Sequence, residues 1–470
     1  MRRVRMEREA ALAEILEARE SRAREQNVLR ERYGSAVVSF TMNIAGPVKD
    51  SPLIRRAFQA GRDQLKAGLT AAGLPVLEWR ERRAVTGCEA LCAVEGAARD
   101  VKAACTSIED ASPLGRLFDM DVLDSGGRKL DREEVGGGPR NCLVCGAAGK
   151  GCASRRVHTA EELRAATRRI LEEHFAAADQ RAVSALVTRA LLDEVCVTPK
   201  PGLVDRSNNG SHRDMDIFTF NASAAALAPW WGRFFQIGRE TADRIPADAF
   251  GALRRAGQAA ERDMFLATDG VNTHKGAIFT LGLICGGAGR LWRAEAPCRD
   301  PEKILAECAA MAAEAVRGDL AALGKEGVRT AGERLYLEHG LSGVRGEAAR
   351  GFPGISQTAL PALKSALAAG RSRDEAGAIA LLHLIARGTD TNMASRGGLE
   401  RAAAAAEQCG RLLERDPLPG PEEIGELDRA FIRGNLSPGG CADLLAAALF
   451  LQSWERAGAA GADGQENLRT

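Results

Sequence analysis

The sequence predicts a multidomain protein in which an α+β domain precedes a larger all-α domain. Three observations lead to this prediction. The chain has 470 residues, more than one ordinary hydrophobic core organises. Residues 35–150 contain short β-branched and apolar runs that end at glycine or proline, which is typical of strands. After Cys152, alanine-rich segments with helical spacing of apolar residues dominate.

The first domain is expected to begin with an exposed helix in the first thirty residues, where Leu12, Ile15 and Leu16 form one apolar stripe among charges. We expect strands at four places in a mixed sheet, namely residues 36–44, 75–87, 89–96 and 114–124. A segment with turn composition follows at residues 125–140.

The second domain is expected to consist of helices separated by loops rich in Gly, Asn, Asp and His. The expected boundaries are a first domain at 1–165, a helical linker at 166–182, an all-α domain at 183–458 and a flexible tail at 459–470.

Composition excludes several classes of protein. The 64 basic and 63 acidic residues give a net charge of +1, and aromatic residues are only 4%, so we expect no nucleic-acid partner. There is no long uncharged apolar run, so we expect no membrane partner. The N-terminus reads as neither signal peptide nor anchor, and the 12 cysteines read as reduced thiols, which favours the cytoplasm.

The stretch "GRLFDMDV" is a candidate phosphoryl-transfer site. Residues two apart share one face of a strand, so Asp119 and Asp121 lie side by side. Two adjacent carboxylates favour a cation between them, and Mg²⁺ binds carboxylate and phosphate oxygens together. Arg116 is positioned to clamp a phosphate. The alternative is a solvated edge strand.

The stretch "CLVCGAAGKGCASRRVH" offers four candidate ligands for a structural Zn²⁺, namely Cys142, Cys145, Cys152 and His158. All four positions would be filled by protein, which leaves no place for a reactive water. The alternative is a set of reduced cysteines that close the last turn of the domain.

Five polar islands interrupt the helical domain. In chain order they hold Lys200, Asp205, His212, Asp214 and Asp216; Asn272, Thr273, His274 and Lys275; Arg345 and Glu347; Asp390, Asn392 and Arg396; and Asn435, Ser437 and the pair Gly439 and Gly440. Each island alone reads as a cap and a turn. Together they indicate the lining of one cleft for a polyphosphate, because glycine and helix N-termini admit anions.

Lys275 illustrates the argument. Asn272 or Thr273 can cap the helix that starts here, but a cation in its first turn is unfavourable against the helix dipole unless an anion lies there too. A bound triphosphate would supply that anion.

These motifs carry a resemblance to known families. "PKPGLVDRSNNGSHRDMD", "GVNTHKGAIFTLG", "GVRGEAARGFP", "DTNMASRGG" and "NLSPGGCADLLA", spread over residues 183–455, resemble the triphosphoribosyl-dephospho-CoA synthase family. "SFTMNIAGPVK", "TGCEAL", "PLGRLFDMDV" and "RNCLVCGAAGKGCASRRVH", within residues 10–165, resemble the apo-citrate lyase phosphoribosyl-dephospho-CoA transferase family.

The resemblance implies two steps and assigns roles. The second domain would join ATP to 3′-dephospho-CoA with release of adenine, and the first would transfer phosphoribosyl-dephospho-CoA to a serine of the citrate lyase acyl carrier subunit with release of diphosphate. Asp119 and Asp121 would hold Mg²⁺, with Lys49 and Arg116 on phosphates. Asp214, Asp216 and Asp390 would share Mg²⁺ and general-base roles. The candidate triphosphate ligands are Lys200, His274, Lys275, Arg345 and Arg396.

Two other functions fit the same residues. An analogous enzyme pair matures the carrier of malonate decarboxylase. A binding scaffold would recruit the carrier without chemistry, although the five aspartates argue against it. Release of adenine from ATP distinguishes the scaffold from the enzymes. No sequence feature fixes the oligomeric state.

Overall fold

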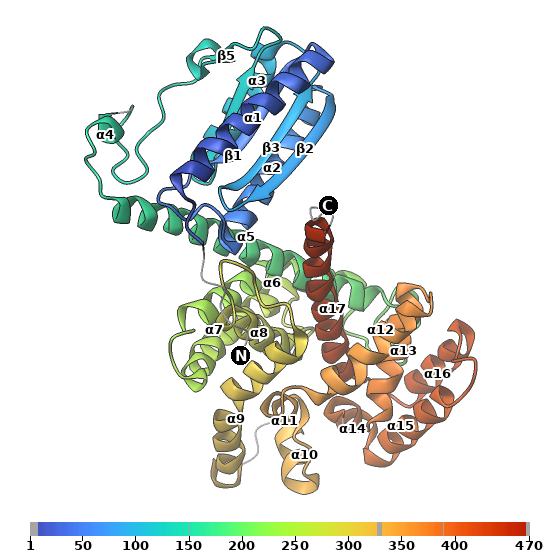
Figure 1. The fold of residues 1–470 in the computed structure, drawn as a ribbon. Helices are drawn as coiled ribbons and strands as arrows, with labels where there is room; N and C mark the ends of the chain where they lie inside the picture. Colours follow the sequence, from blue (N-terminus) through green and yellow to red (C-terminus); the bar gives the residue numbers. More distant parts are fainter. Residues whose placement is uncertain (1–7, 150, 327–330, 389, 467–470) are drawn as a thin grey trace. The chain divides into compact units, whose positions relative to one another are not determined.

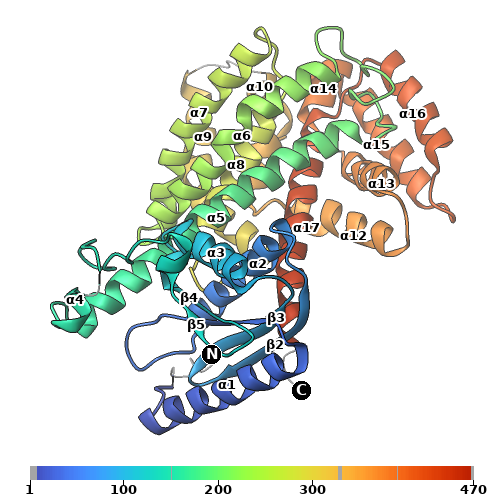
Figure 2. The same ribbon diagram turned by 90° about the horizontal axis from the view of Figure 1, so that it is seen from above.

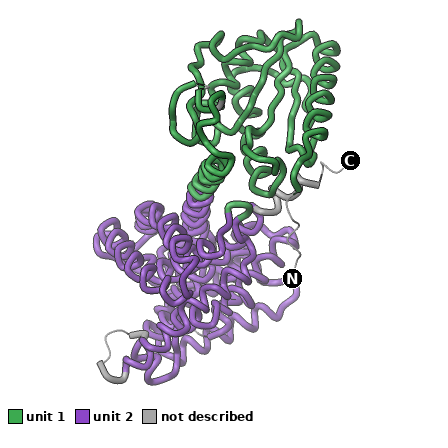
Figure 3. Tube along the Cα trace, turned by 60° about the vertical axis from the view of Figure 1, so that its left-hand side comes forward, with its two compact units in different colours: residues 1–178, 294–296, 463–470 green, residues 179–293, 297–462 purple. Residues whose placement is uncertain are grey.

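The structure is a computed structural model that describes residues 8–149, 151–326, 331–388 and 390–466. The chain divides into two compact units (Figure 3). Unit 1 comprises residues 1–178, 294–296 and 463–470, and unit 2 comprises residues 179–293 and 297–462. The division after Ala178 falls within helix α5 (Ala160–Cys196) and within the segment expected as a linker.

Unit 1 is built on an antiparallel sheet with the strand order β2-β3-β1-β4-β5 (Figure 1). The described strands are β1 (Ala36–Met42), β2 (Val76–Ala84), β3 (Gly87–Val94), β4 (Phe118–Leu123) and β5 (Lys129–Leu130). The expectation of a mixed sheet is wrong, because each pairing of described strands is antiparallel. The physical reason is connectivity: the β2–β3 hairpin inserts β3 beside β1, and a helical crossover then places β4 on the other side of β1. This is the βαββαβ topology of ferredoxin-like domains.

Helices cover both faces of the sheet. Helix α1 (Leu12–Tyr33) lies on one face, and α2 (Pro52–Ala71) and α3 (Ala98–Asp110) lie on the other (Figure 2). On the α2 side, Phe40 of β1 stacks on Phe58 with ring centroids 4.9 Å apart. This burial ties β1 to α2 and gives the sheet its apolar side.

Helix α1 does not bury the apolar stripe that its sequence indicates. Leu12 and Leu16 are 73% and 50% exposed, whereas Ala18 and Leu29 are buried. Leu29 packs with Val37 and Leu91 of the sheet. The apolar contact with the sheet therefore comes from Leu29, and not from the stripe at the start of the helix.

The rest of unit 1 is short and irregular. A 3₁₀ turn, η1 (Gly115–Leu117), precedes β4, and β5 and a second 3₁₀ turn, η2 (Arg132–Val135), occupy the expected turn segment. Helix α4 (Gly151–Ser154) then leads toward α5.

Unit 2 contains helices and no strand within its described residues. They are α6 (Ile217–Glu240), α7 (Pro246–Ala267), α8 (Lys275–Arg290), α9 (Pro301–Glu326), α10 (Ala331–His339), α11 (Gly343–Ala349), the π-helical turn η3 (Ile355–Ala359), α12 (Leu360–Ala368), α13 (Arg373–Ala386), α14 (Thr391–Gly397), α15 (Leu399–Leu413), α16 (Pro421–Arg433) and α17 (Gly439–Glu466). Helix α17 continues through much of the segment expected as a tail, and residues 467–470 lie outside the described residues.

Helix α8 is the buried axis of unit 2. Glycines let it approach α6 closely: a Cβ built on Gly289 would stand 2.1 Å from the carbonyl oxygen of Phe235. The glycine spacing of this helix is thus a requirement of helix packing. No helix in the described chain is both long enough and apolar enough to cross a membrane.

Candidate active sites

Asp119 and Asp121 lie on the sheet face that α1 covers. In the strand register Asp119 is the partner of Thr41 and Asp121 is the partner of Ser39. The predicted alternation is confirmed, because the residues between and beside the aspartates, Phe118, Met120 and Val122, are buried. β4 lies between β1 and β5, but β5 pairs only with Val122 and Leu123, so the alternative of an edge strand stays open at the two aspartates.

The two aspartates line a cavity of about 470 Å³ between α1 and the sheet. Three cations line the same cavity: Arg19 and Arg22 from α1, and Lys49 from the segment after β1. Burial and the charge of Arg19 lower the pKa of Lys49. Two cations that repel each other at a cavity create a favourable position for an anion.

The two aspartates repel each other, as the cations of the cavity do. Burial, and then the charge of Asp121, raise the pKa of Asp119. Asp121 also forms a 2.7 Å ion pair with Lys129 of β5. Adjacent carboxylates with this mutual repulsion fit a divalent cation, which bonds oxygen ligands and relieves the repulsion. The cavity therefore brings together a pair of carboxylates that could hold a divalent cation and cations that could hold an anion.

Arg116 lies elsewhere. Its Nη2 donates a hydrogen bond to the carbonyl of Asn141, and it is absent from the described lining of the cavity. Burial, and then the charges of Arg140 and Arg132, lower its pKa. The structure thus brings Lys49, but not Arg116, to the aspartates.

In unit 2 the polar islands come together. His212 Nε2 lies 2.8 Å from Ser437 Oγ, which joins the first island to the fifth. Arg396 of the fourth island donates to the carbonyl of Ser211, and over 3.1 Å to Asn435 Oδ1. These contacts connect segments that are far apart in the sequence.

Further contacts complete the convergence. Asp390 Oδ2 accepts a 2.8 Å hydrogen bond from the backbone N–H of Cys441 in the first turn of α17. A Cβ on Gly439 would stand 3.0 Å from Asn392 Nδ2. A Cβ on Gly343 would stand 3.2 Å from Thr391 Oγ1, which places the start of α11 beside the start of α14.

A buried carboxyl group, Asp443, lies at the N-terminus of α8. It accepts a hydrogen bond from the backbone of Ala277, and a Cβ on Gly276 would stand 1.9 Å from its Oδ2. Burial, and then the charges of Glu194 and Asp390, raise its pKa well above the usual range. Burial also raises the pKa of Asp390, although Met393 and Cys441 donate backbone hydrogen bonds to it.

His274 is a neutral histidine. Its Nδ1 lies 2.7 Å from Ser223 Oγ, and the hydroxyl of Thr273 donates to that same oxygen over 2.8 Å. Which of Ser223 Oγ and His274 Nδ1 donates in this hydrogen bond depends on the tautomer of the ring. Nε2 is buried and has no hydrogen-bond partner among the described residues. Burial, and then the charge of Lys200, lower the pKa of His274 to about 3.

Several predicted substrate ligands have local structural partners. Lys200 is 1% exposed and forms a 2.6 Å ion pair with Glu194, so its ammonium is occupied within the protein. Asp205 accepts hydrogen bonds from the backbone of Lys200, Ser207 and Asn208 and holds the first island in its turn.

Other members of the predicted set act as caps or braces. Asp216 caps α6 by accepting the backbone N–H of Thr219 over 2.9 Å. Glu347 accepts a 2.7 Å hydrogen bond from Gly354 and a 3.0 Å hydrogen bond from Arg387. Asn272 Oδ1 accepts from the backbone N–H of Lys275 over 3.3 Å and starts α8.

Lys275 and Arg345 line a cavity of about 500 Å³ that lies beside α7, α8 and α9. Phe250 and Phe279 contribute apolar wall. Lys275 is 56% exposed and lies 3.2 Å from a carboxylate oxygen of Glu261, so a protein anion already offsets its charge at the helix start. The cavity holds charges of both signs, since Glu261, Asp319 and Glu333 line it together with Arg254, Lys275 and Arg345.

The structure does not gather Asp214, Asp216 and Asp390 into one metal-binding group. Among the described residues, clustered ligand atoms from three or more Cys, His, Asp or Glu residues occur only at Cys142, Cys145, Cys152 and His158. Asp214 is 64% exposed beside His212, with 3.8 Å between Oδ1 and Nδ1. The division of Mg²⁺ and general-base roles among these three aspartates stays a prediction.

Sequence reasoning missed several residues of each site. Arg19 and Arg22 belong to a helix that reads as solvent-exposed, and their place at the cavity follows only from the packing of α1. Asp443 had a detectable signal, because it is an acidic residue between alanine and leucine in an apolar run. Glu194 is likewise a buried charge, and it has Lys200 as its partner.

Comparison with known proteins gives two family matches. Residues 10–174 match the family model described as apo-citrate lyase phosphoribosyl-dephospho-CoA transferase. Residues 180–461 match the family model described as ATP:dephospho-CoA triphosphoribosyl transferase. The two matches meet where the compact units divide.

Two relatives match this chain over nearly their whole length. Protein CitXG of Haemophilus influenzae is 35% identical over 453 residues, which covers 94% of this chain and 96% of the relative. Protein CitXG of Leuconostoc mesenteroides subsp. cremoris is 33% identical over 462 residues, with the same coverage of 94% and 96%. The 2-(5″-triphosphoribosyl)-3′-dephosphocoenzyme-A synthase of Pectobacterium atrosepticum is 47% identical over 261 residues, covering 55% of this chain and 85% of the relative.

Proposed function

This chain belongs to the CitXG family, and we infer from this premise that it makes and attaches the prosthetic group of citrate lyase. It joins an apo-citrate lyase phosphoribosyl-dephospho-CoA transferase to an ATP:dephospho-CoA triphosphoribosyl transferase. The observation that supports this function best is the presence of two unlike sites in one chain. Unit 1 has a cavity lined by aspartates and cations, and unit 2 has buried carboxyls beneath converging helix starts.

The first reaction takes place in unit 2. The 2′-hydroxyl of 3′-dephospho-CoA attacks C1′ of the ATP ribose, and the bond from C1′ to adenine breaks. The hydroxyl proton is released, and adenine leaves with the electron pair of the broken bond and takes up a proton. The product is 2′-(5″-triphosphoribosyl)-3′-dephospho-CoA.

The second reaction takes place in unit 1. The hydroxyl oxygen of a carrier serine attacks the phosphorus next to the ribose of that product. The bond to the outer two phosphates breaks, diphosphate leaves with the electron pair, and the serine proton is released. The carrier then holds phosphoribosyl-dephospho-CoA through a phosphodiester.

In unit 2 the roles follow from burial and hydrogen bonding. Positive charge develops on the ribose in such a substitution, and a fixed carboxylate stabilises it. We assign this role to Asp390: burial raises its pKa, but the backbone hydrogen bonds from Met393 and Cys441 act in the opposite direction and stabilise the carboxylate. Asp443, whose burial favours the protonated carboxyl, donates the proton to adenine.

The triphosphate of ATP is assigned to the cavity beside α7, α8 and α9. Lys275 and Arg345 line this cavity and bind phosphate oxygens. His274 contributes an uncharged ring, since its pKa of about 3 keeps it neutral. Of the five islands that the sequence assigns to one polyphosphate cleft, the described lining of this cavity includes only Lys275 and Arg345 from two of them.

In unit 1 the opposed charges of one cavity support a diphosphate site. Mg²⁺ held by Asp119 and Asp121 would offset the negative charge that develops on departing diphosphate. Lys49 and Arg19 bind the phosphate oxygens, because they line the same cavity and their mutual repulsion is relieved by an anion. Arg116 has no role in this assignment.

Zn²⁺ enters the proposal only as a structural ion at the Cys/His cluster, since those residues lie outside the lining of the aspartate cavity. The partners of the chain are ATP, 3′-dephospho-CoA and the acyl carrier subunit of citrate lyase. ATP and dephospho-CoA are cytoplasmic metabolites, so the proposed reactions belong in the cytoplasm.

The experiment follows both products separately. The full chain is incubated with ATP, Mg²⁺ and 3′-dephospho-CoA, and free adenine is measured by chromatography. The apo carrier of citrate lyase is then added, and its mass and the release of diphosphate are recorded. We expect adenine first, then a carrier heavier by one phosphoribosyl-dephospho-CoA.

Two outcomes contradict this function. Absence of adenine release from a folded protein would support the scaffold alternative. Modification of the malonate decarboxylase carrier in preference to that of citrate lyase would move the same chemistry to the other pathway, against the family description that residues 10–174 match.

A further inference from the structure

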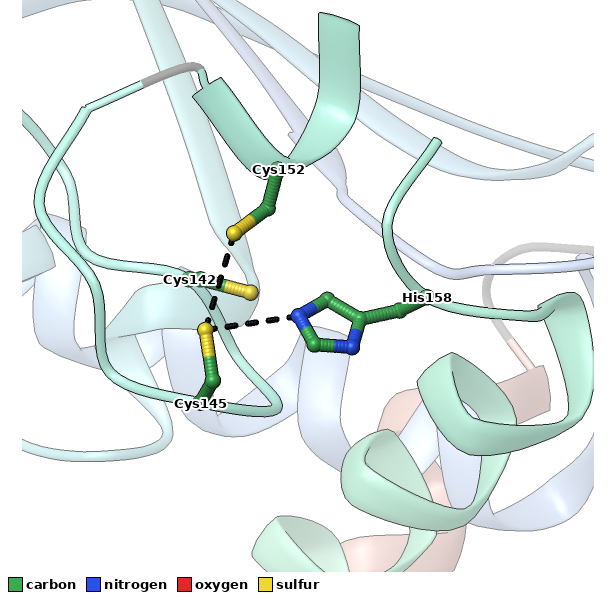
Figure 4. A group of neighbouring side chains, drawn as sticks. All are labelled: Cys142, Cys145, Cys152 and His158. Atoms are coloured by element: carbon green, nitrogen blue, oxygen red, sulfur yellow. Dashed lines mark hydrogen bonds between the residues drawn. The ribbon is translucent and has the colours of Figure 1, made fainter. Parts of the chain in front are cut away.

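Four possible metal ligands converge near the end of unit 1. The side chains of Cys142, Cys145, Cys152 and His158 point toward one another (Figure 4). Their ligand atoms all lie within 4.8 Å of one another. Cys145 Sγ is 3.5 Å from Cys152 Sγ and 3.3 Å from His158 Nε2. None of the four residues lines the cavity of Asp119, so the cluster is separate from the proposed active site.

The spacing fits a tetrahedral zinc ion. With Zn–S near 2.3 Å and Zn–N near 2.0–2.1 Å, a tetrahedron places two sulfurs about 3.8 Å apart and a sulfur and a nitrogen about 3.6 Å apart. The observed 3.5 Å and 3.3 Å lie close to these separations. A disulfide would bring its two sulfurs to about 2.05 Å. The geometry is therefore that of separate thiols around a common centre.

The backbone also prepares the cluster for thiolate ligands. Cys142 Sγ accepts hydrogen bonds from the backbone N–H groups of Val144 and Cys145, as a metal-bound thiolate in a tight Cys-x-x-Cys turn does. The turn is closed by hydrogen bonds from Cys142 N to the Ala147 carbonyl, 2.8 Å, and from Gly146 N to the Cys142 carbonyl, 3.0 Å. Three thiolates and one imidazole fill a structural zinc site completely.

The segment just before the cluster holds the start of strand β4. Arg140 Nη1 donates a 3.0 Å hydrogen bond to the carbonyl of Phe118, and its guanidinium pairs with the buried carboxylate of Glu109. Glu109 in turn accepts the backbone N–H of Met120 over 2.8 Å. Both chain neighbours of Asp119 are thus tied to Arg140, which is two residues from Cys142.

We propose that Cys142, Cys145, Cys152 and His158 bind one structural zinc ion, and that this ion fixes Arg140 against β4 and so positions Asp119 in the transfer site. The zinc site itself stands on the cluster geometry alone. The positioning role rests on the proposed function, because it requires that Asp119 serve the carrier reaction. Adenine release occurs in unit 2 and is independent of both.

Metal content tests the first half. The full chain, purified without chelator, should contain about one zinc per molecule. Cys145→Ser should remove most of it, and Cys196→Ser, a change at a half-buried free cysteine of unit 2, should not. Cobalt added to metal-free protein should give thiolate-to-metal charge-transfer absorption. Metal-free protein that fails to take up cobalt, or a Cys145–Cys152 disulfide found by mass spectrometry, would overturn the site.

Rescue tests the second half. Cys145→Ser should lower carrier transfer about tenfold or more while adenine release is retained, which shows that unit 2 is folded and active. Cys145→His supplies a replacement ligand and should restore both zinc content and transfer. Restored zinc without restored transfer would overturn the positioning role and leave the zinc site standing. If wild-type protein with zinc does not modify the carrier, the proposed function fails instead.

Discussion

Gly276 lies directly against Asp443: a Cβ built on Gly276 would stand 1.9 Å from Asp443 Oδ2. The first turn of α8 therefore has two sides. Lys275 lines the cavity of about 500 Å³, and Gly276, the next residue, lies against the buried carboxyl group of Asp443. Only glycine permits this approach, and the approach places the proposed proton donor at the helix start.

The first prediction concerns this contact. Gly276→Ala should displace Asp443 and lower adenine release by about 100-fold or more, because the carboxyl can no longer hold its position at α8. Carrier modification with added triphosphoribosyl-dephospho-CoA should be unchanged. The matched control is Gly318→Ala in α9, where a Cβ would meet nothing within 4 Å and alanine raises helix propensity. Normal adenine release by the folded Gly276 variant would contradict the role of Asp443.

The two reactions should separate by mutation. Asp119→Asn keeps the shape of the side chain and removes the negative charge proposed to hold Mg²⁺, so carrier transfer should fall by about 100-fold or more. Adenine release should continue, and triphosphoribosyl-dephospho-CoA should accumulate in solution.

Asp443→Asn should do the reverse, since Asn keeps the hydrogen-bonding shape but carries no acidic proton. Adenine release should be lost, and transfer of added intermediate should be retained. Melting curves for both variants establish that they are folded. Loss of both activities in a folded Asp119 variant would mean that the two sites share residues or are coupled.

Lys275 tests the cavity beside α8. Lys275→Ala should raise the KM for ATP about tenfold or more, because the lost partner is a phosphate of the ligand. Stability should change little, since the side chain is 56% exposed and an exposed ion pair such as Lys275–Glu261 contributes about 1 kcal/mol or less. Lys364→Ala, which removes the exposed pair with Glu455, is the control. A large drop in thermal stability with unchanged KM would indicate that Lys275 has only a structural role.

The buried histidine should make unit 2 sensitive to acid. The pKa of His274 falls from 6.5 to about 3 on folding, first because of burial and then because of the charge of Lys200. The unfolded chain therefore binds a proton that the folded chain does not. The resulting stability is complete above pH 6.5 and is lost as the pH falls toward 3, by at most about 1.4 kcal/mol per pH unit.

His274→Asn removes this titration. The variant should be less stable than wild type at pH 7.5, and the difference should shrink as the pH is lowered from 7 to 5, as measured by denaturant unfolding at each pH. His339→Asn, at a histidine whose side chain is 42% exposed, is the control. Parallel stability curves for wild type and the His274 variant would mean that this histidine does not titrate differently on folding.

The order of residues alone was sufficient to predict much of the local structure. The period of "LFDMDV" predicts that Asp119 and Asp121 share a face, and β4 confirms it, because side chains alternate in any strand whatever its neighbours are. The strands β1, β2 and β3 follow from β-branched runs that end at turns. The Cys-x-x-Cys knuckle is equally local, and the structure brings its distant partners Cys152 and His158 to it.

The order of the strands, and the side chains that are paired within the protein, could not be predicted in this way. A mixed sheet is wrong because the order of strands depends on which hairpin inserts beside β1, and sequence spacing does not specify that. Lys200 reads as a ligand for phosphate, but the fold provides Glu194 as its partner. Asp216 reads as catalytic, but it caps α6.

The sequence by itself determined the family, the helical or extended character of most segments and the chemistry of each polar island, because these depend on residues that are close in the chain. Only the tertiary structure decided which charges face a cavity and which are neutralised inside the protein. Arg19 joins Asp119 because α1 packs on that face of the sheet, and Asp443 joins Gly276 because α17 meets the start of α8. Such pairings depend on long-range packing, and packing decides whether a charge is left for a substrate.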